Sequence, residues 1–96
     1  MKLTLMKFGA KWCGPCQALS KAKTLEKFAK AHPEVAVEKH DDTDKGSEAW
    51  SALADKYGVK AMPTLVWVAG EKVLFRSSDV SAGGIEKQLL RAQRMG

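Results

Sequence analysis

The sequence predicts an α/β fold in which three layers enclose a four-stranded mixed sheet, with the elements in the order β-α-β-α-β-β-α. Apolar, β-rich segments alternate with segments whose apolar residues recur at helical spacing, and a short polar turn separates the last two β-rich segments. The two βα units are expected to give parallel strands with right-handed crossovers, and the hairpin to add an antiparallel edge. Residues 1–96 are expected to form one domain.

The first half of the chain is expected to supply two strands and one helix. Residues 3–8 are apolar apart from Thr4 and Lys7, which is typical of a strand buried on both faces. A helix should follow and end before His32-Pro33, because proline cannot continue it. Its apolar stripe consists of Ala18, Ala22, Leu25 and Ala29, with Leu19 and Phe28 beside it. Residues 35–40 are expected to form the second strand.

The second half is expected to supply two helices around a hairpin. Residues 41–47, DDTDKGS, are typical of a polar turn. Ser47 can cap a helix that stops at Gly58. The apolar run TLVWV at 64–68 predicts a central strand, AGEK at 69–72 a hairpin turn, and 73–76 the returning edge strand. For the last helix, Ser81 and the pair Gly83-Gly84 indicate two alternative starts.

Composition and charge narrow the class of protein. The net charge is +5, and the lysines are spread along the chain, so they are expected to coat the surface rather than form a nucleic-acid interface. The N-terminal MKLTLMKF is interrupted by Lys7 before a signal-peptide core can form, and no apolar run approaches the roughly 20 residues of a membrane span. A cytoplasmic protein without a membrane partner is expected.

The two cysteines of the chain are separated by two residues, at the point where the first strand gives way to the first helix. Free backbone N–H groups and the helix dipole favour an anion there, so a Cys13 thiolate should be stabilised. Gly14 is expected to permit the tight turn, and Pro15 fits the first helical turn, where its missing N–H costs nothing. Cys16 lies one turn further on, close to Cys13 but deeper.

This arrangement predicts thiol–disulfide exchange. Cys13 would attack a substrate disulfide, Cys16 would resolve the mixed disulfide, and Trp12 would shield the pair and offer an apolar contact. Two alternatives are a zinc site, which requires four ligands, and two unrelated buried cysteines, against which the intervening Gly-Pro and the helix start stand. The chain has no second cysteine pair, and its two histidines fit no usual finger spacing, so no metal is expected.

The motif WCGPC at 12–16, together with YGVKAMPTL at 57–65, resembles the thioredoxin family. The order of elements matches the core of that family over nearly the whole chain, without the first strand and helix of full-length members. The resemblance implies a thioredoxin-like fold, with Cys13 as nucleophile and Cys16 as resolving thiol. It also implies that Met62, Pro63 and Thr64 form a cis-proline segment beside the cysteines, whose backbone pairs with an extended substrate.

Three positions depart from the family pattern. Lys7 stands where thioredoxins carry a buried aspartate that moves a proton for the resolving cysteine. A cationic Lys7 would stabilise a thiolate, a neutral Lys7 could act as a base, and a Lys7 that reaches the surface would do no chemistry. Glu38 or Lys39 of the next strand is expected beside it, with Glu38 as an ion-pair partner. Lys21 replaces a helix-kinking proline, which predicts a straighter helix, and Ser77 or Ser78 replaces a glycine that borders the substrate groove.

The function implied by the resemblance is the reduction of protein disulfides. Electrons would come from NADPH through a separate thioredoxin reductase, since the chain has no nucleotide-binding glycine loop and no bound cofactor is expected. Its partners would be that reductase and disulfide-containing proteins, with the chain as a monomer. Two alternatives stay open. One is a glutaredoxin-like enzyme that uses glutathione, which Gly83-Gly84 favours, and the other is a non-catalytic subunit of a larger assembly.

Overall fold

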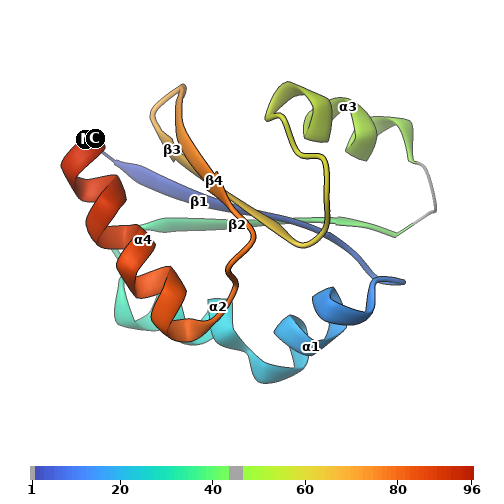
Figure 1. Cartoon of the computed structure of the whole chain (residues 1–96), viewed down its shortest axis with the longest axis horizontal. Helices are drawn as coiled ribbons and strands as arrows, with labels where there is room; N and C mark the ends of the chain where they lie inside the picture. Colours follow the sequence, from blue (N-terminus) through green and yellow to red (C-terminus); the bar gives the residue numbers. More distant parts are fainter. Residues whose placement is uncertain (1, 44–46) are drawn as a thin grey trace.

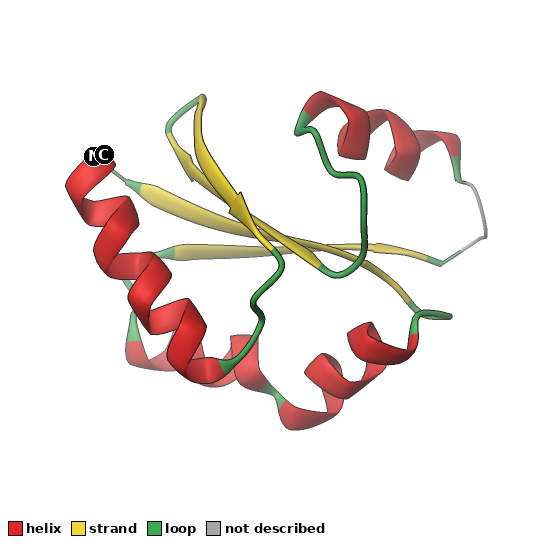
Figure 2. Cartoon of the chain, viewed as in Figure 1, coloured by secondary structure: helices red, strands yellow, loops and turns green. Residues whose placement is uncertain are grey.

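The computed structural model describes residues 2–43 and 47–96, which form four strands and four helices around one mixed sheet. The elements are β1 (Leu3–Ala10), α1 (Gly14–Ala22), α2 (Thr24–Ala31), β2 (Ala36–Asp42), α3 (Glu48–Lys56), β3 (Thr64–Ala69), β4 (Lys72–Ser77) and α4 (Ala82–Met95). The strand order is β2-β1-β3-β4. Helices α1, α2 and α4 cover one face of the sheet, and α3 covers the other (Figures 1 and 2). The predicted three-layer α/β fold is confirmed.

The direction of β3 differs from the prediction. β1 and β2 are parallel, as expected, but β1 and β3 are antiparallel, with Phe8 opposite Thr64. The chain leaves β2 and enters β3 at the same edge of the sheet, because α3 leads away from that edge and residues 57–63 return to it (Figure 1). A parallel crossover would need the chain to reach the opposite edge first. The end of β1 and the start of β3 therefore lie next to each other, at the edge of the sheet where β2 also ends.

The first predicted helix is broken into α1 and α2 at Lys23, which adopts a left-handed conformation with φ of 54°. On one continuous helix, at about 100° per residue, Leu19 and Phe28 would point to opposite sides. The break allows both to be buried in the core. The straighter helix expected from Lys21 is therefore wrong. Two members of the predicted apolar stripe, Ala18 and Ala22, are exposed.

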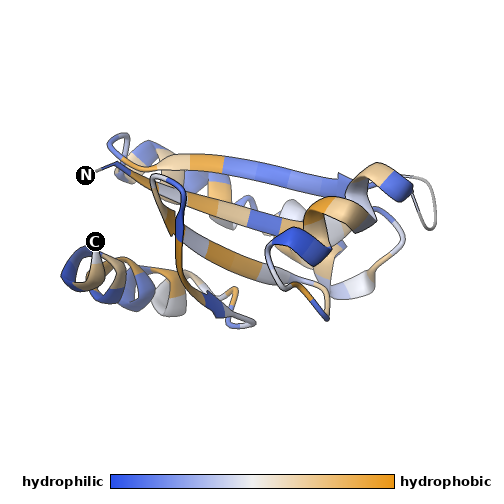
Figure 3. Cartoon of the chain, turned by 90° about the horizontal axis from the view of Figure 1, so that it is seen from above, coloured by the Kyte–Doolittle hydropathy of each residue, from blue (hydrophilic) through white to orange (hydrophobic). Residues whose placement is uncertain are grey.

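Alternate residues of β1 face different helices, and this alternation positions the functional site. Leu3 and Leu5 belong to the core beneath α1, α2 and α4, whereas Met6 and Phe8 belong to the core beneath α3. Because side chains alternate along a strand, Lys7 lies on the α1 side of the sheet. In Figure 3 the strand β2 is hydrophilic over most of its length, which is typical of an exposed edge strand.

Several boundaries refine the predictions. β2 continues to Asp42, so the first two residues of the predicted polar turn are strand, while residues 44–46 of that turn lie outside the described residues. Ser47 caps α3 as predicted, since its Oγ accepts a hydrogen bond from the Trp50 N–H. Of the two alternative starts for α4, the earlier one is right, because Ser81 Oγ accepts from the Gly84 N–H at 3.1 Å.

Candidate active site

Cys13 caps the N-terminus of α1. Its backbone is extended, with φ of −94° and ψ of 121°, and its Sγ accepts a hydrogen bond of 3.4 Å from the Cys16 N–H. Sulfur here takes the place of the Ser or Asp oxygen that usually satisfies the first free amides of a helix. A negative charge on this sulfur is favoured by both the amide and the helix dipole. The local geometry that the sequence predicts for Cys13 is thus present.

The two thiols differ in accessibility. Both are free, Cys13 is half-buried, and only 2% of Cys16 is exposed. Burial raises the pKa of the Cys16 thiol from about 9.0 to about 11, and a hydrogen bond with Cys13 acts in the same direction. A backbone hydrogen bond at Ala10 and the charge of Lys7 lower this pKa, but by less. At neutral pH Cys16 is therefore a protonated thiol beneath the accessible Cys13.

The turn around the cysteines is held by hydrogen bonds to backbone carbonyls. The Cys13 N–H donates to the Ala10 carbonyl at 3.2 Å, and the Gln17 side-chain amide donates to the Lys11 carbonyl at 2.7 Å. Pro15 lies in the first turn of α1, as predicted. The turn-forming role expected of Gly14 is wrong, since its φ is not in the left-handed region and a Cβ there would meet nothing within 4 Å. Gly14 instead leaves the surface beside Cys13 bare.

The residues predicted to bind the substrate lie at the same edge of the sheet as the cysteines. They are Trp12, Met62, Pro63 and Thr64. Trp12 is 45% exposed, which is unusual for a large apolar side chain. The Met62–Pro63 peptide bond is cis, as the resemblance implies, and both residues are half-buried. Thr64 is buried, and its hydroxyl donates to the Ala61 carbonyl at 2.6 Å, so it shapes the loop from within. Since Thr64 lies opposite Phe8, the loop is next to the end of β1.

Lys7 is buried and ion-paired. Only 2% of the residue is exposed, so the prediction that it could reach the surface is wrong. Its Nζ lies 2.7 Å from Asp41 Oδ1, and the Asp41 side chain is 32% exposed. The predicted pairing with Glu38 is also wrong. Lys7 lies opposite Lys39, and in a strand Glu38 points to the other face whereas Asp41 shares the face of Lys39.

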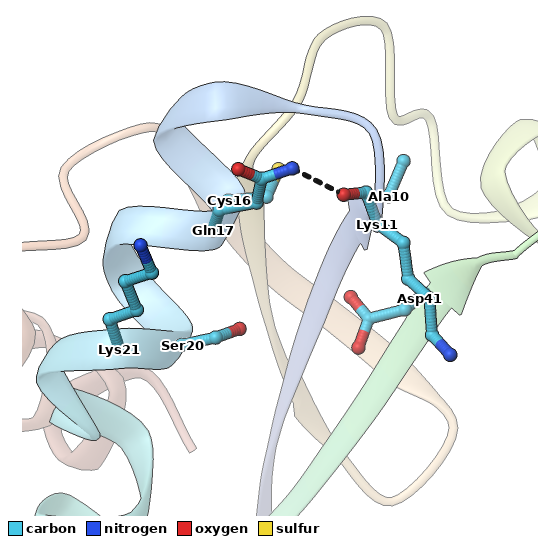
Figure 4. Close-up of a pocket in the computed structure, with 7 residues that line it drawn as sticks. All are labelled: Ala10, Lys11, Cys16, Gln17, Ser20, Lys21 and Asp41. Carbon is cyan, nitrogen blue, oxygen red and sulfur yellow. Dashed lines mark hydrogen bonds between the residues drawn. The ribbon is translucent and has the colours of Figure 1, made fainter.

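Gly9 brings the ion pair and the buried thiol together. A Cβ at Gly9 would lie 3.0 Å from Cys16 Sγ and 3.2 Å from Asp41 Oδ1. Cys16 and Asp41 also line a common pocket of about 420 Å³ between α1 and the ends of β1 and β2, with Lys11 and Lys21 among its other residues (Figure 4). The absence of a side chain at residue 9 leaves this space open.

Sequence reasoning missed both Asp41 and Gly9. The predicted polar turn begins at Asp41, although parallel pairing with β1 indicates that β2 runs further. Parallel strands end at the same edge, and β1 has two more residues than predicted. Gly9 directly follows the predicted strand 3–8, and its signal appears only when β1 is extended to Ala10, because a glycine inside a buried strand often marks a close approach of another group.

The structure also bears on three other possibilities: a glutathione site at Gly83-Gly84, a metal site and a membrane-spanning helix. The Gly84 N–H, one of the amides that a glutathione carboxylate would need, already donates to Ser81, and the Asp79 carboxylate packs against Gly84. Within residues 2–43 and 47–96, no group of three or more potential ligands is arranged to hold a metal ion. None of the described helices is both long and apolar enough to cross a bilayer.

An accessible thiol at a helix N-terminus, backed by a buried second thiol one turn away, defines a dithiol protein capable of disulfide exchange. Comparison with known proteins agrees with this class. Residues 1–93 match the family model described as Thioredoxin. The chain is 34% identical to Thioredoxin-2 of Saccharomyces cerevisiae over 88 residues, which is 92% of this chain and 78% of that protein. It is 38% identical to Thioredoxin-1 of the same yeast over 88 residues, or 92% and 79% of the two chains.

A solved structure gives the same result. The X-ray structure of Fasciola hepatica thioredoxin superposes with a TM-score of 0.75 at 35% identity, covering 95% of this chain and 81% of that one. The chain belongs to the thioredoxin family and is a thiol–disulfide oxidoreductase.

Proposed function

We propose that this protein reduces disulfide bonds in other proteins, with Cys13 as the nucleophile and Cys16 as the resolving thiol. The observation that carries the proposal is the difference between the two sulfurs. Cys13 is accessible and lies at a helix N-terminus, whereas Cys16 is buried with its pKa raised to about 11. A substrate disulfide can therefore reach Cys13 first. The buried Cys16 acts only afterwards, on the disulfide that Cys13 has formed with the substrate.

The reaction then has two steps. The Cys13 thiolate attacks one substrate sulfur, so that a Cys13–substrate disulfide forms and the other substrate sulfur leaves as a thiolate. Cys16 loses its proton and attacks Cys13 Sγ, which breaks the mixed disulfide and releases the second substrate thiolate. The substrate has gained two electrons, and the protein now holds a Cys13–Cys16 disulfide. The raised pKa of Cys16 makes loss of its proton the demanding part of the second step.

The Lys7–Asp41 pair is the group best placed to assist that proton loss. Asp41 Oδ1 and Cys16 Sγ flank the space left by Gly9, and one water molecule can span it. Asp41 accepts the proton, and Lys7 positions the Asp41 carboxylate and lowers the cost of charge on Cys16. In this scheme Lys7 is a positioning residue. The opposite arrangement, with a neutral lysine as base, fits less well because Lys7 is held by a carboxylate.

Substrate binding takes place at the edge where the cysteines and the cis-proline loop meet. Trp12 supplies an exposed apolar surface on one side of Cys13. The backbone before Pro63 pairs with an extended substrate segment, and Met62 contacts it. The bare surface at Gly14 lets the substrate chain approach Cys13 closely.

Electrons return through a separate NADPH-dependent thioredoxin reductase, and the chain itself carries no cofactor. The support is chemical, since the site offers two thiols and no nucleotide-binding glycine loop. A cycle that restores two thiols requires a reducing compartment, which favours the cytoplasm. The protein acts as a monomer, so that the edge around Cys13 stays open to protein substrates.

The reduction potential of the Cys13–Cys16 couple tests this function. The protein is equilibrated in defined glutathione buffers, quenched and analysed by mass spectrometry. A potential near roughly −270 mV is expected for a disulfide reductase. In parallel, a protein disulfide should be reduced with NADPH and thioredoxin reductase. A potential at or above about −200 mV, with a glutathione adduct on Cys13, would instead indicate a glutathione-linked enzyme or an oxidant.

A further inference from the structure

A second pocket, of about 250 Å³, lies beside the cis-proline loop. Ala61 and Thr64, which flank the cis peptide bond, form one side of it, and Lys60, Arg76, Ser77 and Ser78 contribute its polar groups. This pocket does not include the cysteines, and the reaction described above makes no use of it. Its lining is therefore open to another role.

The strand register places this pocket at the same edge of the sheet as the cysteines. Thr64 lies opposite Phe8 near the end of β1, and Ser77 lies opposite Leu65 at the end of β4. The chain that follows β1 at this edge leads directly to Cys13. A substrate segment that pairs with the backbone before Pro63 would therefore pass next to the pocket.

The guanidinium of Arg76 is fixed in place. Its Nε donates to the Tyr57 carbonyl, and the guanidinium packs against the backbone of Gly58, where a Cβ would lie only 2.8 Å from it. Gly58 also has a φ of +68°, so no other residue fits this turn without strain. Arg76 thus presents its remaining N–H groups from a defined position rather than from a free side chain.

The positive charges of the pocket have no acidic partner in the part of the chain that the structure describes. The ion pairs there involve Lys7, His32, Lys39 and His40, but neither Lys60 nor Arg76. Ser77 Oγ accepts a hydrogen bond from the Asp79 N–H, a role that does not use its own O–H as a donor. Two cations and a hydroxyl donor around a small volume match the acceptor oxygens of a carboxylate.

We propose that this pocket binds an acidic side chain, Asp or Glu, that lies within a few residues of the reacting cysteine of the protein substrate. The inference rests on the proposed function, since it assumes that a disulfide-containing segment runs along the cis-proline loop. It makes Lys60 and Arg76 specificity-determining residues. The protein then prefers disulfides in acidic sequence surroundings, and salt weakens this preference.

Three peptide disulfides that differ only at one position near the cysteine, with Glu, Gln or Lys there, provide the test. The rate of their reduction by the reduced protein is measured at low and at high salt. Two exposed ion pairs of ordinary strength correspond to a preference of about fivefold for Glu over Gln. The Lys peptide should be slower than the Gln peptide, and high salt should bring the three rates together.

Variants identify the residues responsible. The double variant Lys60→Gln, Arg76→Gln should bring the ratio of the Glu-peptide rate to the Gln-peptide rate close to one. Lys72→Gln is the matched control for Lys60→Gln, because each removes one positive charge, and Lys72 lies at the opposite end of β4, so it should leave the ratio unchanged. Should the double variant not fold, Lys60→Gln alone, an exposed position, should lower the ratio about twofold.

The outcomes separate the two proposals. Equal rates for all three peptides in the wild type would overturn the acidic pocket while leaving the reductase function intact. A preference that Lys72→Gln lowers as strongly as Lys60→Gln does would assign it to overall charge and also overturn the pocket. Failure to reduce any of the peptides would count against the proposed function itself.

Discussion

The Lys7–Asp41 pair should respond very differently to removal of its two members. Lys7 is 2% exposed, whereas the Asp41 side chain is 32% exposed. Asp41→Ala leaves a buried ammonium group without its partner. Breaking a fully buried pair in this way costs about 3–5 kcal/mol. Because Asp41 already has partial contact with water, which can enter the vacated space, the lower end of that range, about 3 kcal/mol, is expected.

Lys7→Met is the opposite case. It replaces the buried charge with an apolar side chain of similar length and leaves a carboxylate that still reaches water. Replacing buried charges with apolar groups is often neutral or stabilising, so a change within about 1 kcal/mol is expected. The double variant Lys7→Met, Asp41→Ala should then resemble Lys7→Met alone, since no unpaired charge remains.

The free energy of unfolding of the four reduced proteins, measured by urea denaturation at pH 7, checks this asymmetry. The expected order of stability has Asp41→Ala as the least stable, with the double variant recovering most of its loss. If Lys7→Met proves as destabilising as Asp41→Ala, or the double variant loses the sum of both effects, Lys7 is not a buried cation whose charge depends on Asp41, and the reasoning fails.

Three further predictions follow from the same site. Lys7→Met should slow the second step, the attack of Cys16, in stopped-flow measurements of a mixed disulfide, and an unchanged rate would remove Lys7 from the mechanism. Gly9→Ala should cost about 1–3 kcal/mol, because its Cβ would lie 3.0 Å from Cys16 Sγ, whereas Gly14→Ala, with open space around it, should change stability by less than about 0.5 kcal/mol. Equal effects would contradict the close packing at Gly9. The folded state keeps the Cys16 proton between pH 9 and 11, where the unfolded state loses it, so the stability of the reduced protein should fall as the pH rises through that range. Cys16→Ser should lack this part of the pH dependence, and matching pH profiles would show that burial does not raise the pKa of Cys16.

Local patterns in the sequence were sufficient for most of the elements. The continuous apolar run in TLVWV predicts β3, and the caps at Ser47 and Ser81 mark the starts of α3 and α4 as observed. These signals act within a few residues, so they can be read without knowledge of the fold. The cis peptide bond before Pro63 is predicted by the family resemblance and not by the local sequence.

What the sequence did not reveal depends on contacts between distant segments. The break at Lys23 is needed because Leu19 and Phe28 must both reach the same core, which the helix itself does not specify. The direction of β3 depends on where residues 57–63 return to the sheet. Neither feature leaves a periodic signal in the chain.

In the active site, too, local signals were predicted and contacts between distant segments were missed. Cys13 and Cys16 are three positions apart, so their proximity follows from helical geometry alone. The partner of Lys7 was missed because it depends on the register and the length of a neighbouring strand. Asp41 became visible as that partner only once β2 was seen to continue beyond the predicted boundary.

Trapping of the mixed disulfide tests the central claim most directly. Reduced Cys16→Ser and Cys13→Ser variants are mixed with a protein disulfide substrate and analysed by non-reducing mass spectrometry. If Cys13 attacks and Cys16 resolves, the Cys16→Ser variant accumulates a covalent complex through Cys13, while the Cys13→Ser variant forms almost none because its remaining thiol is buried. A complex through Cys16 in the Cys13→Ser variant, at a similar rate, would contradict the assignment of roles to the two thiols.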